Sequence, residues 1–143
     1  MKKILFVEDN GSVFEMLNNE LDSSKYQIVR VRAVDEAKGA VEEDGPFDCY
    51  IVDLQIYPYS LTLSQMAEYQ NREGYAFIKE CLLDGETDKQ KIQDIKSKII
   101  ICSRYILDFK SKYRDEIEGM HLVDKTKEFE KEVASVIEKI CKG

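Results

Sequence analysis

Residues 2–10 read KKILFVEDN, in which four apolar residues run directly into two adjacent acids. The run from Ile4 to Val7 has the length of a buried strand and is too short for a helix. Residues 26–31 (YQIVRV) alternate apolar with polar side chains, as a strand near a sheet edge does. Together with three further short apolar runs, these stretches predict five strands at 4–7, 26–31, 49–52, 99–102 and, more weakly, 120–123.

Amphipathic helices are predicted between these strands, because apolar residues there recur three and four positions apart. Strands that are continuously apolar and joined by helices form parallel sheets with both faces covered. The sequence therefore predicts a doubly wound α/β domain. The predicted helix faces are Val13, Phe14, Leu17 and Leu21; Val34, Ala37 and Val41; and Phe129, Val133, Val136, Ile137 and Ile140.

Length and composition fit one globular domain spanning residues 1–143, with 43% hydrophobic and 34% charged residues. The net charge of -7 argues against direct nucleic-acid binding, which needs clustered lysine and arginine. The apolar run at the start is too short for a signal peptide or a membrane span, so we expect no membrane insertion and a cytoplasmic location. The four cysteines are too far apart for a zinc or thiol-exchange motif and are expected to be buried free thiols.

Five polar residues follow the predicted strands, at the edge of the sheet where ligands of doubly wound folds bind. Three of them are acids, and each close pair of carboxylates would cost about 4 kcal/mol at 4 Å and an effective dielectric of 20. A hard divalent cation with oxygen ligands, for which Mg²⁺ is our expectation, would offset this repulsion. A hydroxyl and an ammonium group beside such a metal suit phosphoryl transfer. The five residues are Glu8, Asp9, Asp53, Ser103 and Lys125.

These residues resemble the receiver domain of two-component response regulators. The resemblance rests on VEDN at 7–10, FDCYIVDL at 47–54, IIICS at 99–103 and LVDK at 122–125, with matching spacing between Asp9 and Asp53 and between Ser103 and Lys125. It covers nearly the whole chain. It implies a flavodoxin-like sheet of order 2-1-3-4-5 with five helices, and a signalling protein rather than an enzyme.

The resemblance also implies a role for each site residue. Asp53 would accept a phosphoryl group from a histidine kinase or phosphotransfer protein. Glu8, Asp9, Asp53 and the backbone carbonyl of Gln55 would hold Mg²⁺. Ser103 and Lys125 would each contact a phosphoryl oxygen, and the output would pass to a downstream protein partner.

The chain departs from the receiver pattern in length between Asp53 and Ser103. The surplus divides into insertions near 56–73 and 84–98, with Gly74 matching the glycine before the third helix of the family. The first insertion is aromatic and is either a partner-docking element or an extra packed turn. The second is charged and is expected to be a solvated loop.

Several single residues also depart from the pattern. Leu122 stands where the family has its switch aromatic, and Tyr105 is a candidate substitute. Thr126 replaces the proline after the conserved lysine, which disfavours the family's cis bond. Arg104 replaces a small residue and either caps phosphoryl oxygens or hinders access. Pro58 lies one position later than usual, and the lone His121 is expected to be structural.

Two alternatives remain open at this point. One is a non-phosphorylated, receiver-like protein-binding module, which the residues at 104, 122 and 126 favour. The other is a phosphatase with an aspartyl-phosphate intermediate, which is disfavoured because Gln55 stands where such enzymes need an acid.

Overall fold

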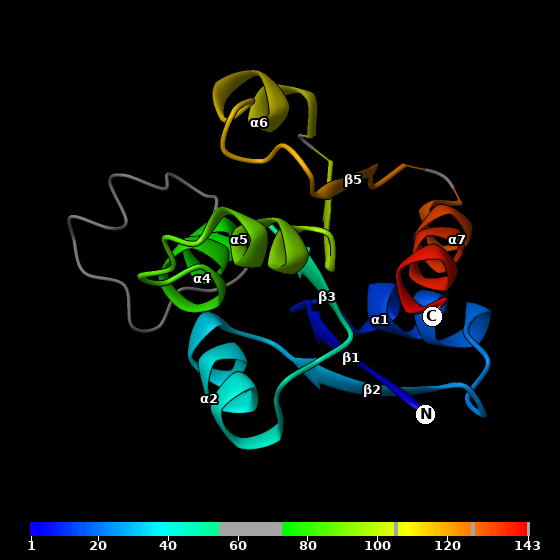
Figure 1. Ribbon diagram of the computed structural model, residues 1–143. Helices are drawn as coiled ribbons and strands as arrows, with labels where there is room; N and C mark the ends of the chain where they lie inside the picture. Colours follow the sequence, from blue (N-terminus) through cyan, green and yellow to red (C-terminus); the bar gives the residue numbers. More distant parts are fainter. Residues whose placement is uncertain (55–72, 105, 127, 143) are drawn as a thin grey trace.

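Five parallel strands form one sheet in the computed structural model of the protein, which describes residues 1–54, 73–104, 106–126 and 128–142 (Figure 1). The strand order is β2-β1-β3-β4-β5, as the resemblance predicts. All neighbouring pairs are parallel, so the carboxyl ends of the strands meet at one edge. The strands are β1 (Lys2–Val7), β2 (Tyr26–Val31), β3 (Cys49–Asp53), β4 (Ile99–Ser103) and β5 (His121–Asp124).

Helices connect the strands and cover both faces of the sheet. Within the described residues these are α1 (Gly11–Glu20), α2 (Val34–Asp44), α4 (Glu73–Phe77) with its π-helical continuation η1 (Ile78–Leu82), α5 (Lys89–Lys96), α6 (Ile106–Lys112) and α7 (Phe129–Cys141). The described residues thus contain six helices when α4 and η1 are counted as one, against the five that the resemblance implies, and α5 is the additional one.

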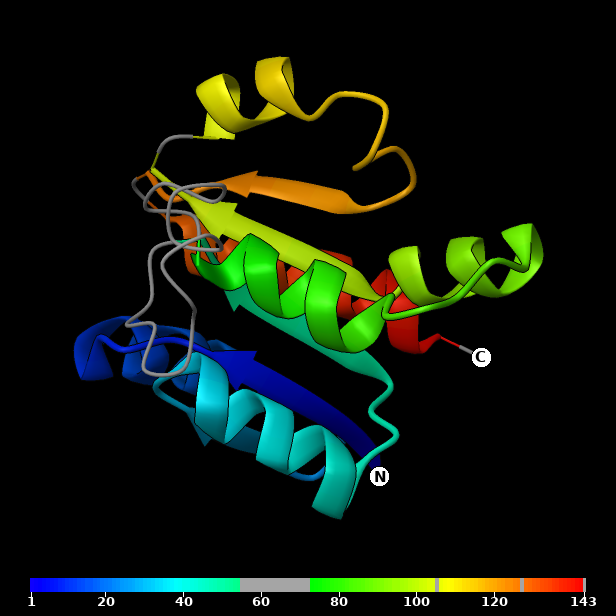
Figure 2. The ribbon, with the colours of Figure 1, turned by 90° about the vertical axis from the view of Figure 1, so that its left-hand side faces the viewer.

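The core has two parts, one on each side of the sheet. Leu17 of α1 and Val133 of α7 pack with one set of strand side chains, which includes Phe6 and Ile51. The opposite set packs under α2, α4, η1 and α6, and Figure 2 shows α2 and α4 lying across that face. The alternation of strand side chains between two buried layers explains why β1, β3 and β4 are apolar throughout.

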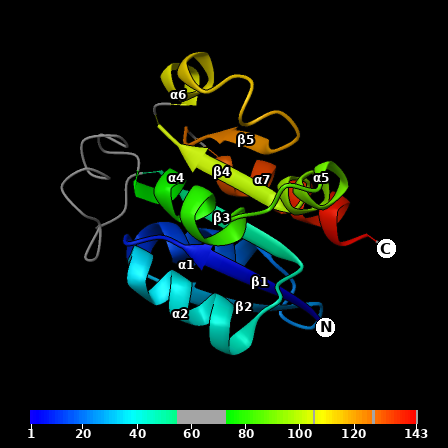
Figure 3. The ribbon, with the colours of Figure 1, turned by 60° about the vertical axis from the view of Figure 1, so that its left-hand side comes forward.

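The segment 84–98 is not a solvated loop, because it contains α5 (Figure 3). The side chain of Asp88 caps this helix by accepting hydrogen bonds from the backbone N–H groups of Gln90 and Lys91 at 2.9 and 3.3 Å. Aspartate is among the preferred N-cap residues, so Asp88 was the residue in the sequence that could have indicated the start of this helix. The first insertion, which includes Pro58, lies almost entirely in 55–72, outside the described residues. Tyr105 also lies outside the described residues.

Among the described residues, no helix is long and apolar enough to span a membrane. All four cysteines are free, in agreement with the expectation, but only Cys49 and Cys102 are fully buried, while Cys81 and Cys141 are half-buried.

Candidate functional site

A pocket of about 410 Å³ lies at the carboxyl edge of the sheet, where β1, β3 and β5 end. Strand alternation brings Glu8, Asp53 and Lys125 to this place, because each lies at or just after the end of its strand, on the face that α1 and α7 cover. Four of the predicted site residues therefore lie together. The pocket is lined by Glu8, Asp9, Asn10, Val13, Asp53, Arg104 and Lys125.

The turn after β1 is held by hydrogen bonds to both sides. The Glu8 backbone N–H donates to the Val31 carbonyl at 2.9 Å, which extends the pairing of β1 with β2. The Asn10 side chain caps α1 by accepting from the N–H groups of Ser12 and Val13 at 2.9 and 3.3 Å. This cap fixes the direction in which the chain leaves the sheet.

Asp53 ends β3 and is almost fully buried, with 7% of its surface exposed. Gly74 packs against the backbone immediately after it, and its N–H donates to the Leu54 carbonyl at 2.9 Å. A Cβ atom at Gly74 would lie 1.9 Å from the Asp53 carbonyl oxygen, so only glycine fits there. The close approach of α4 to the end of β3 therefore depends on Gly74.

Lys125 bridges the two buried acids. Its Nζ atom donates to Glu8 Oε1 at 2.5 Å and to Asp53 Oδ2 at 3.0 Å. Only 11% of the lysine side chain is exposed. The Lys125 backbone N–H donates to the Ser103 carbonyl at 2.9 Å, which fixes the lysine beside the end of β4.

The electrostatics of the pocket reflect its burial. Burial raises the pKa of Glu8 to about 8; the nearby Asp53 charge adds to this rise, and Lys125 opposes it. For Lys125, burial lowers the pKa, but Asp53 and Glu8 outweigh it and the pKa is raised. Below the acids, burial raises the pKa of the Cys102 thiol to about 12, so this cysteine is a neutral core residue.

Glu8, Asp9 and Asp53 form a group that could hold a metal ion. One carboxylate oxygen of each lies within 4.8 Å of the other two. Carboxylate oxygens suit hard cations such as Mg²⁺, which also keeps several water ligands. Asp9 is exposed while the other two acids are buried, so a metal would be reached from solvent on the Asp9 side. The donor set therefore fits the predicted metal.

The remaining predicted site residues are placed as follows. Ser103 ends β4 and is 2% exposed, but it is not among the residues that line the pocket. Arg104, the next residue, is exposed and lines it. Gln55, whose carbonyl was expected to bind the metal, lies outside the described residues.

Two departures from the receiver pattern, Leu122 and Thr126, lie in or just after β5, and the lone histidine begins this strand. Leu122 is half-buried and packs on the face opposite to the pocket, against the core under α6. The Lys125–Thr126 peptide is trans, since the only cis bond of the described residues is Gly45–Pro46. His121 contacts the Ser97 carbonyl through Nε2 at 3.1 Å, which supports a structural role.

Sequence reasoning missed two residues that shape the site. Asn10 could have been found, because asparagine directly before a predicted helix is a preferred cap. Arg30 donates to the carbonyls of Glu8 and Asp9 at 3.3 and 3.4 Å, and its guanidinium lies 5.3 Å from the Phe14 ring centre. Nothing local identifies Arg30, because its role depends on the register of β2 against β1.

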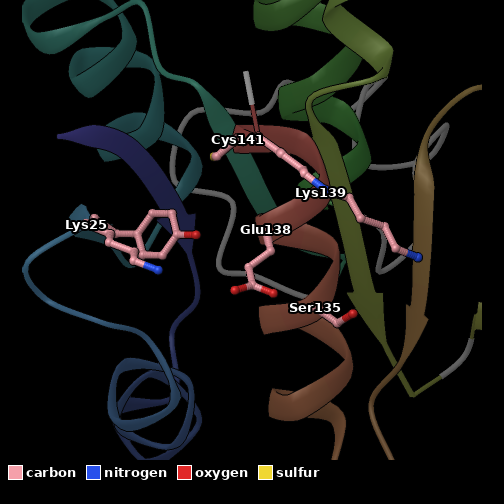
Figure 4. A pocket seen from close by; sticks show the side chains of 7 residues that line it. Lys25, Ser135, Glu138, Lys139 and Cys141 are labelled. Atoms are coloured by element: carbon pink, nitrogen blue, oxygen red, sulfur yellow. The ribbon is translucent and has the colours of Figure 1, made fainter.

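A second groove, of about 450 Å³, lies between the start of β2 and α7 (Figure 4). Glu138 projects from α7 on the side that faces Lys25. The other lining residues are Tyr26, Ser135, Lys139, Cys141 and Lys142, a mixture of charges without a group of converging acids. The acidic pocket is therefore the better candidate for chemistry.

A scan against protein-family models and a search of curated proteins give no match. Solved structures do match. The non-phosphorylated receiver domain of HemR from Leptospira biflexa is 18% identical with a TM-score of 0.67, covering 98% of this chain and 94% of that one. The phosphorylated cyanobacterial phytochrome response regulator RcpA is 16% identical with a TM-score of 0.64, covering 96% and 91%.

A third neighbour is the receiver domain of the sensor histidine kinase PA1611 from Pseudomonas aeruginosa PAO1, solved with a magnesium ion in its active-site cleft. It is 14% identical with a TM-score of 0.61, and the match covers 99% of this chain and 98% of that one. The chain therefore has the fold of the response-regulator receiver domains, as the resemblance in its sequence predicts.

Proposed function

We propose that the protein is a phosphoacceptor receiver domain of a two-component phosphorelay, phosphorylated on Asp53 in the presence of Mg²⁺. The phosphoryl donor would be the phosphohistidine of a histidine kinase or phosphotransfer protein. The P–N bond of the donor breaks, a P–O bond to Asp53 forms, and the imidazole takes up a proton. The protein would then signal through contacts with a downstream protein partner, in the cytoplasm.

One observation carries the proposal: three carboxylates and one lysine converge in a single pocket at the carboxyl edge of a receiver fold. Glu8, Asp9 and Asp53 would hold Mg²⁺, together with the Gln55 carbonyl. When bound, the metal neutralises charge on the transferred group. The phosphorylated and the magnesium-bound neighbours are consistent with this reading.

Lys125 already contacts the Asp53 carboxylate, so it is positioned to donate to a phosphoryl oxygen attached there. Ser103 would contribute a hydroxyl if the end of β4 turned toward the pocket. Neither group has to carry out acid–base chemistry, because phosphoryl transfer depends mainly on positioning and charge. The protein would assist its own phosphorylation without acting as an enzyme on other substrates.

The proposal is tested with acetyl phosphate and Mg²⁺, followed by intact-protein mass spectrometry. We expect a mass gain of one phosphoryl group that is lost in Asp53→Asn and retained in Asp84→Asn, a control at an exposed aspartate. A wild-type protein that gains no mass from acetyl phosphate or from a panel of phosphorylated histidine kinases would overturn the proposal.

A second candidate is a receiver-like module that binds a protein without being phosphorylated. Leu122 at the switch position and Arg104 in the pocket favour it. The same experiment separates the two, because this module would show no Asp53-dependent mass gain. Equal binding of a partner by wild type and Asp53→Asn would then support the module.

A further inference from the structure

Of the residues that the structure describes, two cationic side chains line the pocket, and Arg104 is the one that forms no ion pair with its acids. Lys125 pairs with Glu8 and Asp53, whereas the Arg104 guanidinium makes no hydrogen bond or ion pair within the described residues. It follows Ser103 at the end of β4, two positions after Cys102. Continued strand alternation places Arg104 on the side of the sheet that carries Asp53 and Lys125.

The charge of the pocket explains why a second cation belongs there. Three carboxylates face one lysine and one arginine. A bound divalent cation would make the pocket slightly positive with Arg104 and neutral without it. A phosphoryl group brings about two negative charges near neutral pH, so Arg104 favours the phosphorylated state over the unphosphorylated one.

We infer that Arg104 binds the phosphoryl group on Asp53, donating two parallel N–H groups to its oxygens. This inference rests on the proposed function. The planar guanidinium matches phosphate geometry in a way that an ammonium group does not. A pocket of about 410 Å³ has room for the group, since a water molecule takes up only about 30 Å³ in the liquid. Arg104 therefore supplies N–H donors to the phosphoryl oxygens from the β4 side of the pocket, and Lys125 supplies them from the β5 side.

The test measures binding of beryllofluoride, a phosphoryl mimic that attaches to aspartate, in excess Mg²⁺. Charge-assisted hydrogen bonds are strong enough that Arg104→Ala should weaken binding at least about tenfold. Arg104→Lys should recover only part of this loss, because lysine keeps the charge and loses the paired geometry. Arg104 is exposed, so both variants are expected to fold, which thermal unfolding checks.

Arg32→Ala is the matched control, because Arg32 is an exposed arginine directly after β2 that does not line the pocket. Its affinity should equal that of wild type. A second readout is the ¹⁵N NMR signal of the Arg104 side-chain N–H group, which should shift when beryllofluoride is added.

The inference is overturned if Arg104→Ala binds beryllofluoride within twofold of wild type, or if Arg32→Ala loses as much affinity as Arg104→Ala. A lysine variant as tight as wild type would rule out the paired contact. Failure of the wild-type protein to bind beryllofluoride is a different result, since it would remove the proposed function itself.

Discussion

Two regions around the pocket, called corners below, differ in how closely they follow the receiver pattern. The β1–β3 corner consists of Glu8, Asp9 and Asp53 with their supports Arg30 and Gly74. The β4–β5 corner consists of Ser103, Arg104, Leu122, Lys125 and Thr126. The first agrees with the pattern at each acid and at Gly74, whereas the second agrees at Ser103 and Lys125 and departs at the other three positions.

This difference shows that different contacts fix the residues of the two corners. The acids are fixed by strand register and by backbone contacts, such as that of Gly74 with Leu54, so a change there disturbs the sheet as well as the charge. Leu122 packs against the opposite core layer and does not line the pocket. Under the proposed function, the β1–β3 corner would hold the metal and the phosphorylated aspartate, whereas Lys125 and Arg104 of the β4–β5 corner would contact the phosphoryl oxygens.

The largest expected effect is that of Gly74→Ala, which disrupts the packing of α4 against the end of β3 in the β1–β3 corner. The added Cβ would lie 1.9 Å from the Asp53 carbonyl oxygen, so α4 or the end of β3 has to move. We expect a loss of about 3 kcal/mol or more in the free energy of unfolding, measured in urea.

Gly39→Ala is the control for this experiment. Gly39 lies within α2 and a Cβ there would meet nothing within 4 Å. Alanine should therefore stabilise the helix by about 0.5–1 kcal/mol. An equal, small effect of both substitutions would contradict the role of Gly74.

Lys125→Met breaks the link between the two corners. It leaves Glu8 and Asp53 buried without their shared cation, and removing one partner of a buried pair costs about 3 kcal/mol or more. We expect this loss in urea unfolding at pH 8.5, with partial recovery in Mg²⁺ because the metal replaces the missing charge. The loss should shrink at pH 6, where Glu8 binds a proton.

Lys131→Met serves as the comparison, since Lys131 pairs with Glu128 on the surface and should show no measurable change. Full stability of Lys125→Met at pH 8.5 without a metal would show that the lysine does not hold the corners together.

The pH dependence of metal binding sharpens the comparison, because it follows the protonation of Glu8 in the β1–β3 corner. The pKa of Glu8 is raised from 4.5 to about 8, so the folded protein binds a proton there more tightly than the unfolded chain does. The stability that this proton contributes is complete below pH 4.5 and is lost as the pH rises through 8.

Because Mg²⁺ needs the ionised carboxylate, its affinity should fall by up to about tenfold for each pH unit below 8. Titration calorimetry at pH 6, 7 and 8 measures this. Glu8→Gln should bind more weakly and lose this dependence. An affinity for Mg²⁺ that is the same in wild type at pH 6 and pH 8 would disprove the coupling.

Leu122→Ala gives the smallest effect and tests whether the β4–β5 corner can change without loss of chemistry. The side chain is half-buried against the core, so we expect a cost of about 1 kcal/mol, below the range for fully buried leucines. Phosphorylation by acetyl phosphate, followed by mass spectrometry, should proceed at the wild-type rate. A clearly slower reaction would mean that Leu122 acts on the pocket after all.

Prediction from the sequence succeeded where the signal was local and periodic. The strand 26–31 was placed at its observed limits, and the weak run at 120–123 was displaced by one residue from β5. The helix α5 was missed, because its polar sequence has no strong apolar stripe and only the cap at Asp88 marks its start. Charge alone does not separate a solvated loop from an exposed helix.

The amino-acid sequence by itself determined the α/β class, the strand-end acids and the likeness to receiver domains. These follow from residue type and spacing along the chain. Only the tertiary structure decided that Lys125 bridges Glu8 and Asp53, that Arg30 holds the turn after β1, and that Arg104 lines the pocket while Ser103 does not. The physical reason is that these contacts join residues far apart in the chain, and their distances are set by the register and alternation of the parallel strands.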